Sequence, residues 1–276
     1  MTPTRRTLLS FFLLLALFHF TPAGVLAEET YKFEENILYR EGDELSEYER
    51  ERCRLDVYYP VADTPFATVV WFHGGGLQAG NKYLPAGLKE QGIAVVPVNY
   101  RLYPKVKSPA YIDDAAAAVA WVFKHIESYG GSKQKIFVAG HSAGGYQAFL
   151  VGLDKSYLKK YDVNADDIAG LIPYSGHTIT HFAVRDEVGI SEKQPLVDGM
   201  APLTHIRKDA PPLLMVTGDR ELEMLGRYEE NAYMWRMLKV VGHPSATLHE
   251  LDGFNHGNMS EPAHFLTLDF VRKHSK

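Results

Sequence analysis

The stretch KIFVAGHSAGGYQAF, residues 135–149, decides the fold because it reads as a buried strand, a sharp turn and a helix in immediate succession. The apolar run ends at Gly140, and the small and apolar residues from Ala143 onward are typical of a buried helix. Ser142 stands between Gly140 and Gly144, so the turn matches G-x-S-x-G, in which a strained turn exposes the serine hydroxyl. The glycines let neighbouring backbone pass without a Cβ clash. Read alone, the motif allows either a nucleophilic serine or a tight structural turn.

Short apolar runs recur along the rest of the chain, each followed by a polar or glycine-rich loop and then by a helical pattern. The runs are apolar on both faces, which suits parallel strands covered on both sides by helices. The sequence therefore predicts an α/β fold, with a doubly wound, mostly parallel sheet and helices on both faces. Strands are expected over residues 55–60, 68–72, 93–100, 135–140, 168–176, 212–219 and 246–253, and helices over 111–127, 143–153, 226–241 and 262–274.

Residues 28–276 are expected to form a single domain, because no repeat or low-complexity segment interrupts the alternation of strands and helices. The exception is 175–210, which contains several glycines and prolines and has no long period. A long stretch of this kind in a compact domain usually carries function. Because ligands of such folds bind outside the carboxyl ends of the strands, we expect 175–210 to form a short cap excursion over that edge.

The N-terminal residues read as a signal peptide. Arg5 and Arg6 precede an apolar run over residues 8–20, and small-spaced residues ending at Ala27 offer a cleavage site. The run is shorter than the roughly 20 residues that a membrane-spanning helix needs. Residues 1–27 are therefore expected to be removed on export to the periplasm or the medium. The paired arginines leave open whether the general or the twin-arginine route is used.

Composition and charge exclude several classes of protein. The chain is 46% hydrophobic and 23% charged, which is ordinary for a globular domain. Its formal net charge of −5, which becomes more negative without the two N-terminal arginines, gives no electrostatic reason to expect a nucleic-acid or membrane partner. Cys53 is the single cysteine, so no internal disulfide is possible, and we expect this residue to be buried. The oligomeric state cannot be predicted from the sequence.

A second glycine motif, His73-Gly74-Gly75-Gly76, directly follows the apolar run 68–72. An isolated run of three glycines is usually a flexible turn. Here it precedes the serine motif by about 70 residues, and backbone amides of such a loop can approach a substrate oxygen closely. The pair of motifs predicts an oxyanion hole made by the amides of Gly74, Gly75 and Ala143.

With HGGG followed by GHSAGG, the sequence resembles the α/β-hydrolase serine carboxylesterases related to hormone-sensitive lipase, acetyl esterases and kynurenine formamidase. The resemblance covers roughly residues 50–272, and the segment 99–122 also looks like the one these esterases carry between the two motifs. One departure is His141, because the lipase-like members usually have an aspartate before the serine. The chain looks closer to the branch that cleaves sugar esters and formamides, similar to the BD-FAE proteins.

The resemblance implies a triad in the order serine, acid, histidine, with Ser142 as the nucleophile. The acid is expected after the strand 212–219 in a G-x-x-D/E pattern, which places Glu221 at the family position and leaves Asp219 as the alternative. The base is expected after the last strand, where LDGFNHGN supplies His256. His256 would take the proton of Ser142, and the acid would orient the imidazole.

The remaining candidates concern the substrate pocket and a metal. His177 and His181 have i, i+4 spacing, but the glutamate of H-E-x-x-H is missing, so neither a metal nor another cofactor is expected. The pocket is expected to be lined by residues near the serine and at the start of the excursion, namely His141, Tyr174 and His177, with Ser175, Gly176 and Phe182 beside them.

These features together predict an exported serine carboxylesterase that hydrolyses small esters through an acyl-enzyme. The expected substrate is a small-molecule or carbohydrate ester, such as an acetyl or aryl ester on a plant-derived sugar. The same triad attacks amides, so an aryl-formamidase or amidase is the alternative. A non-catalytic binding homologue is the third possibility, although that class usually lacks one of the three triad residues.

Overall fold

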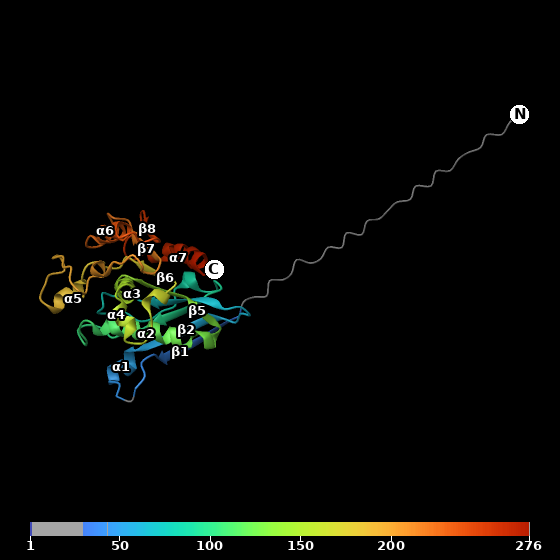
Figure 1. The fold of residues 1–276 in the computed structure, drawn as a ribbon, viewed down its shortest axis with the longest axis horizontal. Helices are drawn as coiled ribbons and strands as arrows, with labels where there is room; N and C mark the ends of the chain where they lie inside the picture. The colour runs from blue at the N-terminus through green and yellow to red at the C-terminus, as the bar shows by residue number, and fades with distance from the viewer. Residues whose placement is uncertain (2–29, 43, 276) are drawn as a thin grey trace.

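The computed structural model describes residues 1, 30–42 and 44–275, and its centre is one eight-stranded sheet (Figure 1). The strand order is β1-β2-β4-β3-β5-β6-β7-β8, with β1 and β2 antiparallel to their neighbours and the remaining strands mutually parallel. The strands are β1 (Tyr31–Leu38), β2 (Arg54–Pro60), β3 (Phe66–Phe72), β4 (Ala94–Val98), β5 (Gly131–His141), β6 (Gly170–Tyr174), β7 (Leu213–Gly218) and β8 (Ala246–Leu251). The predicted α/β fold with a mostly parallel sheet is confirmed.

Seven α-helices lie in the described part of the chain. They are α1 (Glu47–Arg52), α2 (Ala110–His125), α3 (Ala143–Leu153), α4 (Lys155–Lys159), α5 (Phe182–Glu187), α6 (Arg227–Val240) and α7 (Ser260–His274). Short 3₁₀ helices cover Ala86–Leu88, Ile126–Tyr129, Ala165–Asp167 and Pro202–His205. Each predicted strand and long helix is present, whereas β1 and the short helices α1, α4 and α5 were not predicted.

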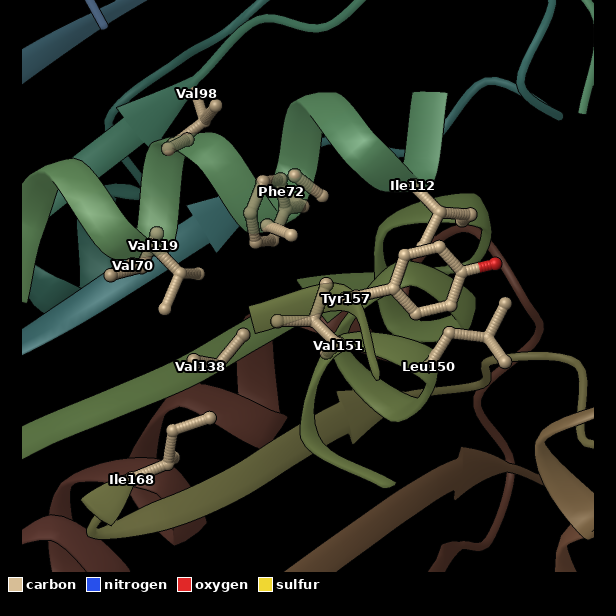
Figure 2. Packing of buried hydrophobic residues seen from close by; sticks show 14 of the residues in the cluster. Val70, Phe72, Val98, Ile112, Val119, Val138, Leu150, Val151, Tyr157 and Ile168 are labelled. Atoms are coloured by element: carbon tan, nitrogen blue, oxygen red, sulfur yellow. The ribbon is translucent and has the colours of Figure 1, made fainter. Parts of the chain in front are cut away.

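Alternation along the central strands divides the core between the two faces of the sheet. Val70 and Phe72 of β3 belong to the cluster that includes α2 and α3, which Figure 2 shows from close by. Val69 and Trp71 belong to a second cluster with the apolar side of α7. Successive side chains of a strand point to opposite faces, so strands that are apolar throughout are covered by helices on both sides, as their composition predicted.

A buried ion-pair network ties the first strand to the main body of the sheet. The side chain of Asp114, on α2, is fully buried and lies 2.7 Å from the guanidinium of Arg40 and 2.8 Å from that of Arg101. Arg40 follows β1, and Arg101 follows β4. The network joins three segments that are distant in the sequence. Each arginine also has a second carboxylate partner, since Asp113 lies 2.7 Å from Arg40 and Glu49 lies 3.2 Å from Arg101. Cys53 is buried close to this region, between α1 and β2, as expected.

The parallel strands end along one edge, and this arrangement gathers the loops that carry the candidate residues. The segments after β3, β5, β6, β7 and β8 all leave from that edge. The predicted excursion 175–210 follows β6 and contains α5 and the 3₁₀ helix Pro202–His205. The predicted signal peptide, residues 1–27, lies outside the described residues except for Met1. Among the residues described, no helix is long and apolar enough to cross a membrane.

Substituting Asp114 by Asn is expected to lower the free energy of unfolding by about 3 kcal/mol, because it removes the fully buried carboxylate that both arginines share and leaves each with one partly exposed partner, Asp113 or Glu49. Urea unfolding measures this change. The matched control is Asp269→Asn, since Asp269 pairs with Arg272 on the surface with 79% of its side chain exposed. That substitution should change the free energy of unfolding by less than about 0.5 kcal/mol. Equal effects of the two substitutions would contradict the role given to Asp114.

Candidate active site

Ser142 occupies the sharp turn between β5 and α3. Its backbone has φ 56° and ψ −114°, a conformation that side-chain-bearing residues rarely adopt. The turn is fixed by the Ser142 amide, which donates to the carbonyl of Tyr174 at 2.8 Å. A Cβ at Gly144 would lie 2.0 Å from the Phe72 carbonyl oxygen, and one at Gly140 would lie 2.5 Å from the Gly144 carbonyl carbon. Both glycines of G-x-S-x-G are therefore required because α3 starts directly against the backbone of the sheet.

The serine is connected to a histidine and a carboxylate. His256 Nε2 lies 2.9 Å from Ser142 Oγ, and His256 Nδ1 lies 2.7 Å from Glu223 Oε2. Ser142 is 7% exposed, and the side chain of Glu223 is 1% exposed. An ionised carboxylate only accepts hydrogen bonds, so Nδ1 carries a proton and Nε2 is left to accept the proton of the serine. The predicted pairing of Ser142 with His256 is present in the structure.

The carboxylate beside His256 is Glu223, so the assignment of Glu221 or Asp219 to that position is wrong. The loop after β7 turns tightly, and the amides of both Leu222 and Glu223 donate to the Asp219 carbonyl. This turn directs Glu221 to solvent and brings Glu223, two residues further on, back to His256. The Asp219 carboxylate is engaged elsewhere, where it accepts from the amides of Glu221 and Gly253, each at 2.9 Å.

Sequence reasoning missed Glu223 because three carboxylates follow β7 within residues 219–223. Residue type does not distinguish them, and the family spacing points to Glu221. Only the path of the loop selects Glu223, and no local pattern in the sequence indicates that path.

Glu223 is held as an anion by several donors. Burial by itself raises the pKa of this carboxyl, but hydrogen bonds from His256, Ser175 and the Gly218 amide outweigh burial and lower the pKa to about 2. Oε1 accepts from Ser175 Oγ at 2.5 Å and from the Gly218 amide at 2.9 Å. Glu223 therefore remains charged at neutral pH and faces the His256 imidazole.

The HGGG loop lies directly beside the serine turn. A Cβ at Gly74 would lie 3.2 Å from the His141 carbonyl oxygen and 3.4 Å from Ser142 Cβ. Gly75 has φ 109°, and a Cβ there would lie 2.1 Å from the Ala79 carbonyl oxygen. No residue in the described part of the chain accepts a hydrogen bond from the amides of Gly74, Gly75 or Ala143. These amides are therefore available to a ligand oxygen, as expected for an oxyanion hole.

His141 contacts the backbone of His256. Its Nε2 lies 2.8 Å from the His256 carbonyl oxygen, and the centres of the two rings are 4.9 Å apart. A carbonyl only accepts, so His141 Nε2 carries a proton and donates. Burial, with a smaller contribution from the charge of His256, lowers the pKa of His141 to about 4. The residue is therefore neutral at pH 7 and supports the loop that carries His256.

Two residues predicted to line the substrate pocket do not do so. Tyr174 is fully buried on the opposite face of the sheet, where its hydroxyl contacts Thr267 and its ring packs against Trp71. His177 is also fully buried, and its Nδ1 lies 2.9 Å from the Glu230 carboxylate. The pocket prediction failed for Tyr174 because strand alternation directs its side chain to the face of the sheet covered by α7, whereas Ser142 leads into α3 on the other face.

The histidines His177 and His181 pack against each other inside the domain. The two rings are 5.0 Å apart, and no group of three or more potential metal ligands exists among the described residues. Burial, reinforced by the charge of Arg227, lowers the pKa of His177 well below its ordinary value. Both side chains are packed inside the domain near Phe182.

Comparison with known proteins identifies related sequences. Esterase LipC of Mycobacterium tuberculosis is 25% identical over 256 residues, which cover 85% of this chain and 62% of that protein. A probable carboxylic ester hydrolase of the same organism, LipM, is 30% identical over 169 residues, which cover 52% of this chain and 39% of LipM. The chain thus spans less than two thirds of the length of these relatives.

A solved structure described as a truncated carbohydrate esterase from gut microbiota superposes with a TM-score of 0.73. The identity is 20%, and the match covers 90% of this chain and 98% of that one. This likeness confirms the α/β-hydrolase fold. The model of the BD-FAE family matches residues 55–224, from β2 to the loop that carries Glu223. Since this match takes in both glycine motifs and more than half of the chain, the protein belongs to the BD-FAE family.

Proposed function

We propose that the protein is a serine carboxylesterase that uses Ser142, His256 and Glu223 as its triad. The observation that carries the proposal is the continuous relay from Ser142 Oγ to His256 Nε2 at 2.9 Å and from His256 Nδ1 to Glu223 Oε2 at 2.7 Å. The relay stands beside three free backbone amides, which are placed to receive an oxyanion. Its completeness argues against a non-catalytic binding homologue.

In the first half of the reaction, Ser142 Oγ attacks the ester carbonyl carbon while its proton passes to His256 Nε2. The carbonyl oxygen becomes an oxyanion and accepts hydrogen bonds from the amides of Gly74, Gly75 and Ala143. Glu223, already ionised, stabilises the imidazolium that forms. His256 then gives the proton to the leaving alcohol, the C–O bond to that alcohol breaks, and an acyl-serine remains.

In the second half, water attacks the acyl-serine and His256 Nε2 takes the water proton. The same amides hold the second oxyanion. When the tetrahedral intermediate collapses, the proton returns to Ser142 Oγ and the carboxylic acid leaves. The residues named supply each proton transfer in this sequence, and no cofactor enters the proposed reaction.

The proposed substrates are small esters, such as acetyl or aryl esters on plant-derived carbohydrates. Support comes from the membership of the BD-FAE family and from the fold shared with a protein described as a carbohydrate esterase. The alternative is an aryl-formamidase or amidase. It is favoured by His141, which replaces the aspartate of the lipase-like pattern and is buried against the catalytic loop.

We also propose that the protein is exported, with cleavage after Ala27. The charged, apolar and small-residue segments of the N-terminus support this proposal. N-terminal sequencing of the periplasmic or secreted protein tests it, since the mature chain would begin at Glu28.

Replacing Ser142 with Ala is expected to reduce hydrolysis of p-nitrophenyl acetate by at least about 10⁴-fold in kcat, because the nucleophile is removed. Steady-state kinetics measure the loss, and an unchanged thermal unfolding midpoint shows that the fold is retained. Wild-type hydrolysis of p-nitrophenyl acetate by this variant would contradict the proposed function.

Replacing Glu223 with Gln is expected to lower kcat by up to about 10⁴-fold, since the amide cannot stabilise the imidazolium as a carboxylate does. Glu221→Gln is the matched control, because Glu221 lies two residues away and is exposed. That substitution should leave kcat within about threefold. A larger effect of Glu221→Gln than of Glu223→Gln would contradict the geometric assignment of the acid.

The ester and formamide alternatives are distinguished by comparing kcat/KM for acetyl, butyryl, octanoyl and feruloyl esters with that for N-formylkynurenine. We expect the acetyl or feruloyl ester to have the highest value. A higher kcat/KM for N-formylkynurenine would favour the formamidase alternative, and the loss of both activities in the Ser142→Ala variant would show that they share one site.

A further inference from the structure

Ser175 is the first residue after β6, and its hydroxyl lies next to both Glu223 and His256. Its side chain is fully buried. Ser175 Oγ lies 2.5 Å from Glu223 Oε1 and 3.1 Å from His256 Nδ1. The hydroxyl is therefore on the Nδ1 side of the imidazole, opposite Ser142, where a substrate at Nε2 does not reach it.

The hydrogen-bond donors and acceptors assign a direction to each of these contacts. Glu223 is an anion and only accepts, so the single proton of the Ser175 hydroxyl is donated to Oε1. A lone pair of Ser175 Oγ then faces the Nδ1–H of His256, which also donates to Glu223 Oε2. Ser175 thus holds one carboxylate oxygen and offers the imidazole a second acceptor.

The backbone of Ser175 is fixed in a conformation that a side-chain-bearing residue seldom adopts. Its φ is 46°, in the left-handed region. The Ser175 amide donates to the Val216 carbonyl at 2.7 Å, and the buried guanidinium of Arg227 donates to the Ser175 carbonyl. The next residue, Gly176, has no space for a Cβ, which would lie 2.6 Å from the Gly145 carbonyl carbon. Strained backbone persists only where the surroundings fix it, and here they fix the direction of the hydroxyl.

Without the hydroxyl, Glu223 Oε1 would keep the Gly218 amide at 2.9 Å as its donor. Oε2 would still accept from His256 Nδ1 at 2.7 Å and from the Met224 amide at 3.3 Å. The position of Oε1, and with it the plane of the carboxylate, would then depend on a single donor. The hydrogen bond to a charged acceptor is also stronger than one between neutral groups, so its loss is more costly than that of an ordinary buried contact.

We infer that Ser175 is a positioning residue that acts through Glu223, fixing the carboxylate in the plane where it meets His256 and stabilising the imidazolium that forms during turnover. The inference rests on the proposed function of Ser142 and His256. Because Ser175 has no exposed surface and touches neither Ser142 Oγ nor the oxyanion amides, its removal should affect kcat and leave KM unchanged.

The test compares Ser175→Ala with Ser175→Gly. Both remove the hydroxyl, but glycine also tolerates the positive φ, so any effect that comes from the strained backbone should separate the two variants. We expect both to lower kcat by about 10- to 100-fold, the size expected for losing a hydrogen bond to a charged group. Thr217→Val is the control, since its buried hydroxyl has no hydrogen-bond partner within the described residues, and it should keep the wild-type kcat.

A double-mutant cycle decides whether Ser175 acts through Glu223. In a Glu223→Gln background, Ser175→Ala should reduce kcat by less than about twofold, because the charged acceptor is already gone. The full reduction in that background would overturn the inference, and so would a Ser175→Ala variant with wild-type kcat. If the Ser175→Ala variant does not fold, the same kcat values are compared with Ser175→Gly in its place.

A spectroscopic readout keeps this inference separate from the proposed function. The Nδ1–H proton of His256, hydrogen-bonded to an anion, is observed by proton NMR and is assigned by its absence in His256→Ala. Ser175→Gly should move this resonance, while Thr217→Val should not. The charged Arg227 on α6 and the neutral His141 also face this site, so both must be intact in each variant. A moved resonance with no esterase activity in the wild type would contradict the proposed function alone, and an unmoved resonance would overturn the inference.

Discussion

The constraint on which the site depends is the contact between the start of α3 and the backbone of β3. A side chain at Gly144 would enter the Phe72 carbonyl, so the helix lies closer to the sheet than an ordinary residue permits. This close approach forces the positive φ of Ser142 and places its hydroxyl at the carboxyl edge. It also brings the loop that follows Phe72 alongside, so that one packing contact sets the positions of both the Ser142 hydroxyl and the free amides of Gly74 and Gly75.

The edge of the sheet then determines which other residues meet the serine. The loops after β6, β7 and β8 supply Ser175, Glu223 and His256, which are joined by hydrogen bonds of 2.5–3.1 Å. Each of these residues is fixed by a neighbour from another strand or loop, as when the Ser175 amide donates to Val216 of β7. The relay is therefore assembled by long-range backbone pairing, and its precision depends on the register of the parallel strands.

The parts that could be predicted from the sequence are those in which one short segment determines both residue type and geometry. The strand-turn-helix around Ser142 and the HGGG loop are such segments, and both were identified. The acid was assigned to Glu221 because residue spacing does not reveal how a loop folds back. The hydrogen bond from the Gly253 amide to the Asp219 carboxylate, which helps to shape this loop, joins residues that are distant in the sequence. Tyr174 was misplaced because its side chain points to the opposite face, and β1 was missed because its exposed, charged residues give little apolar signal.

The contact of Phe182 with the HGGG loop has a consequence for how this site can be altered. A Cβ at Gly76 would lie 2.9 Å from the end of the Phe182 ring, so the excursion after β6 rests on the loop that presents the oxyanion amides. The two segments cannot be redesigned independently. Phe182 is the first residue of α5, so a substitution there changes the packing against Gly76, the neighbour of Gly74 and Gly75.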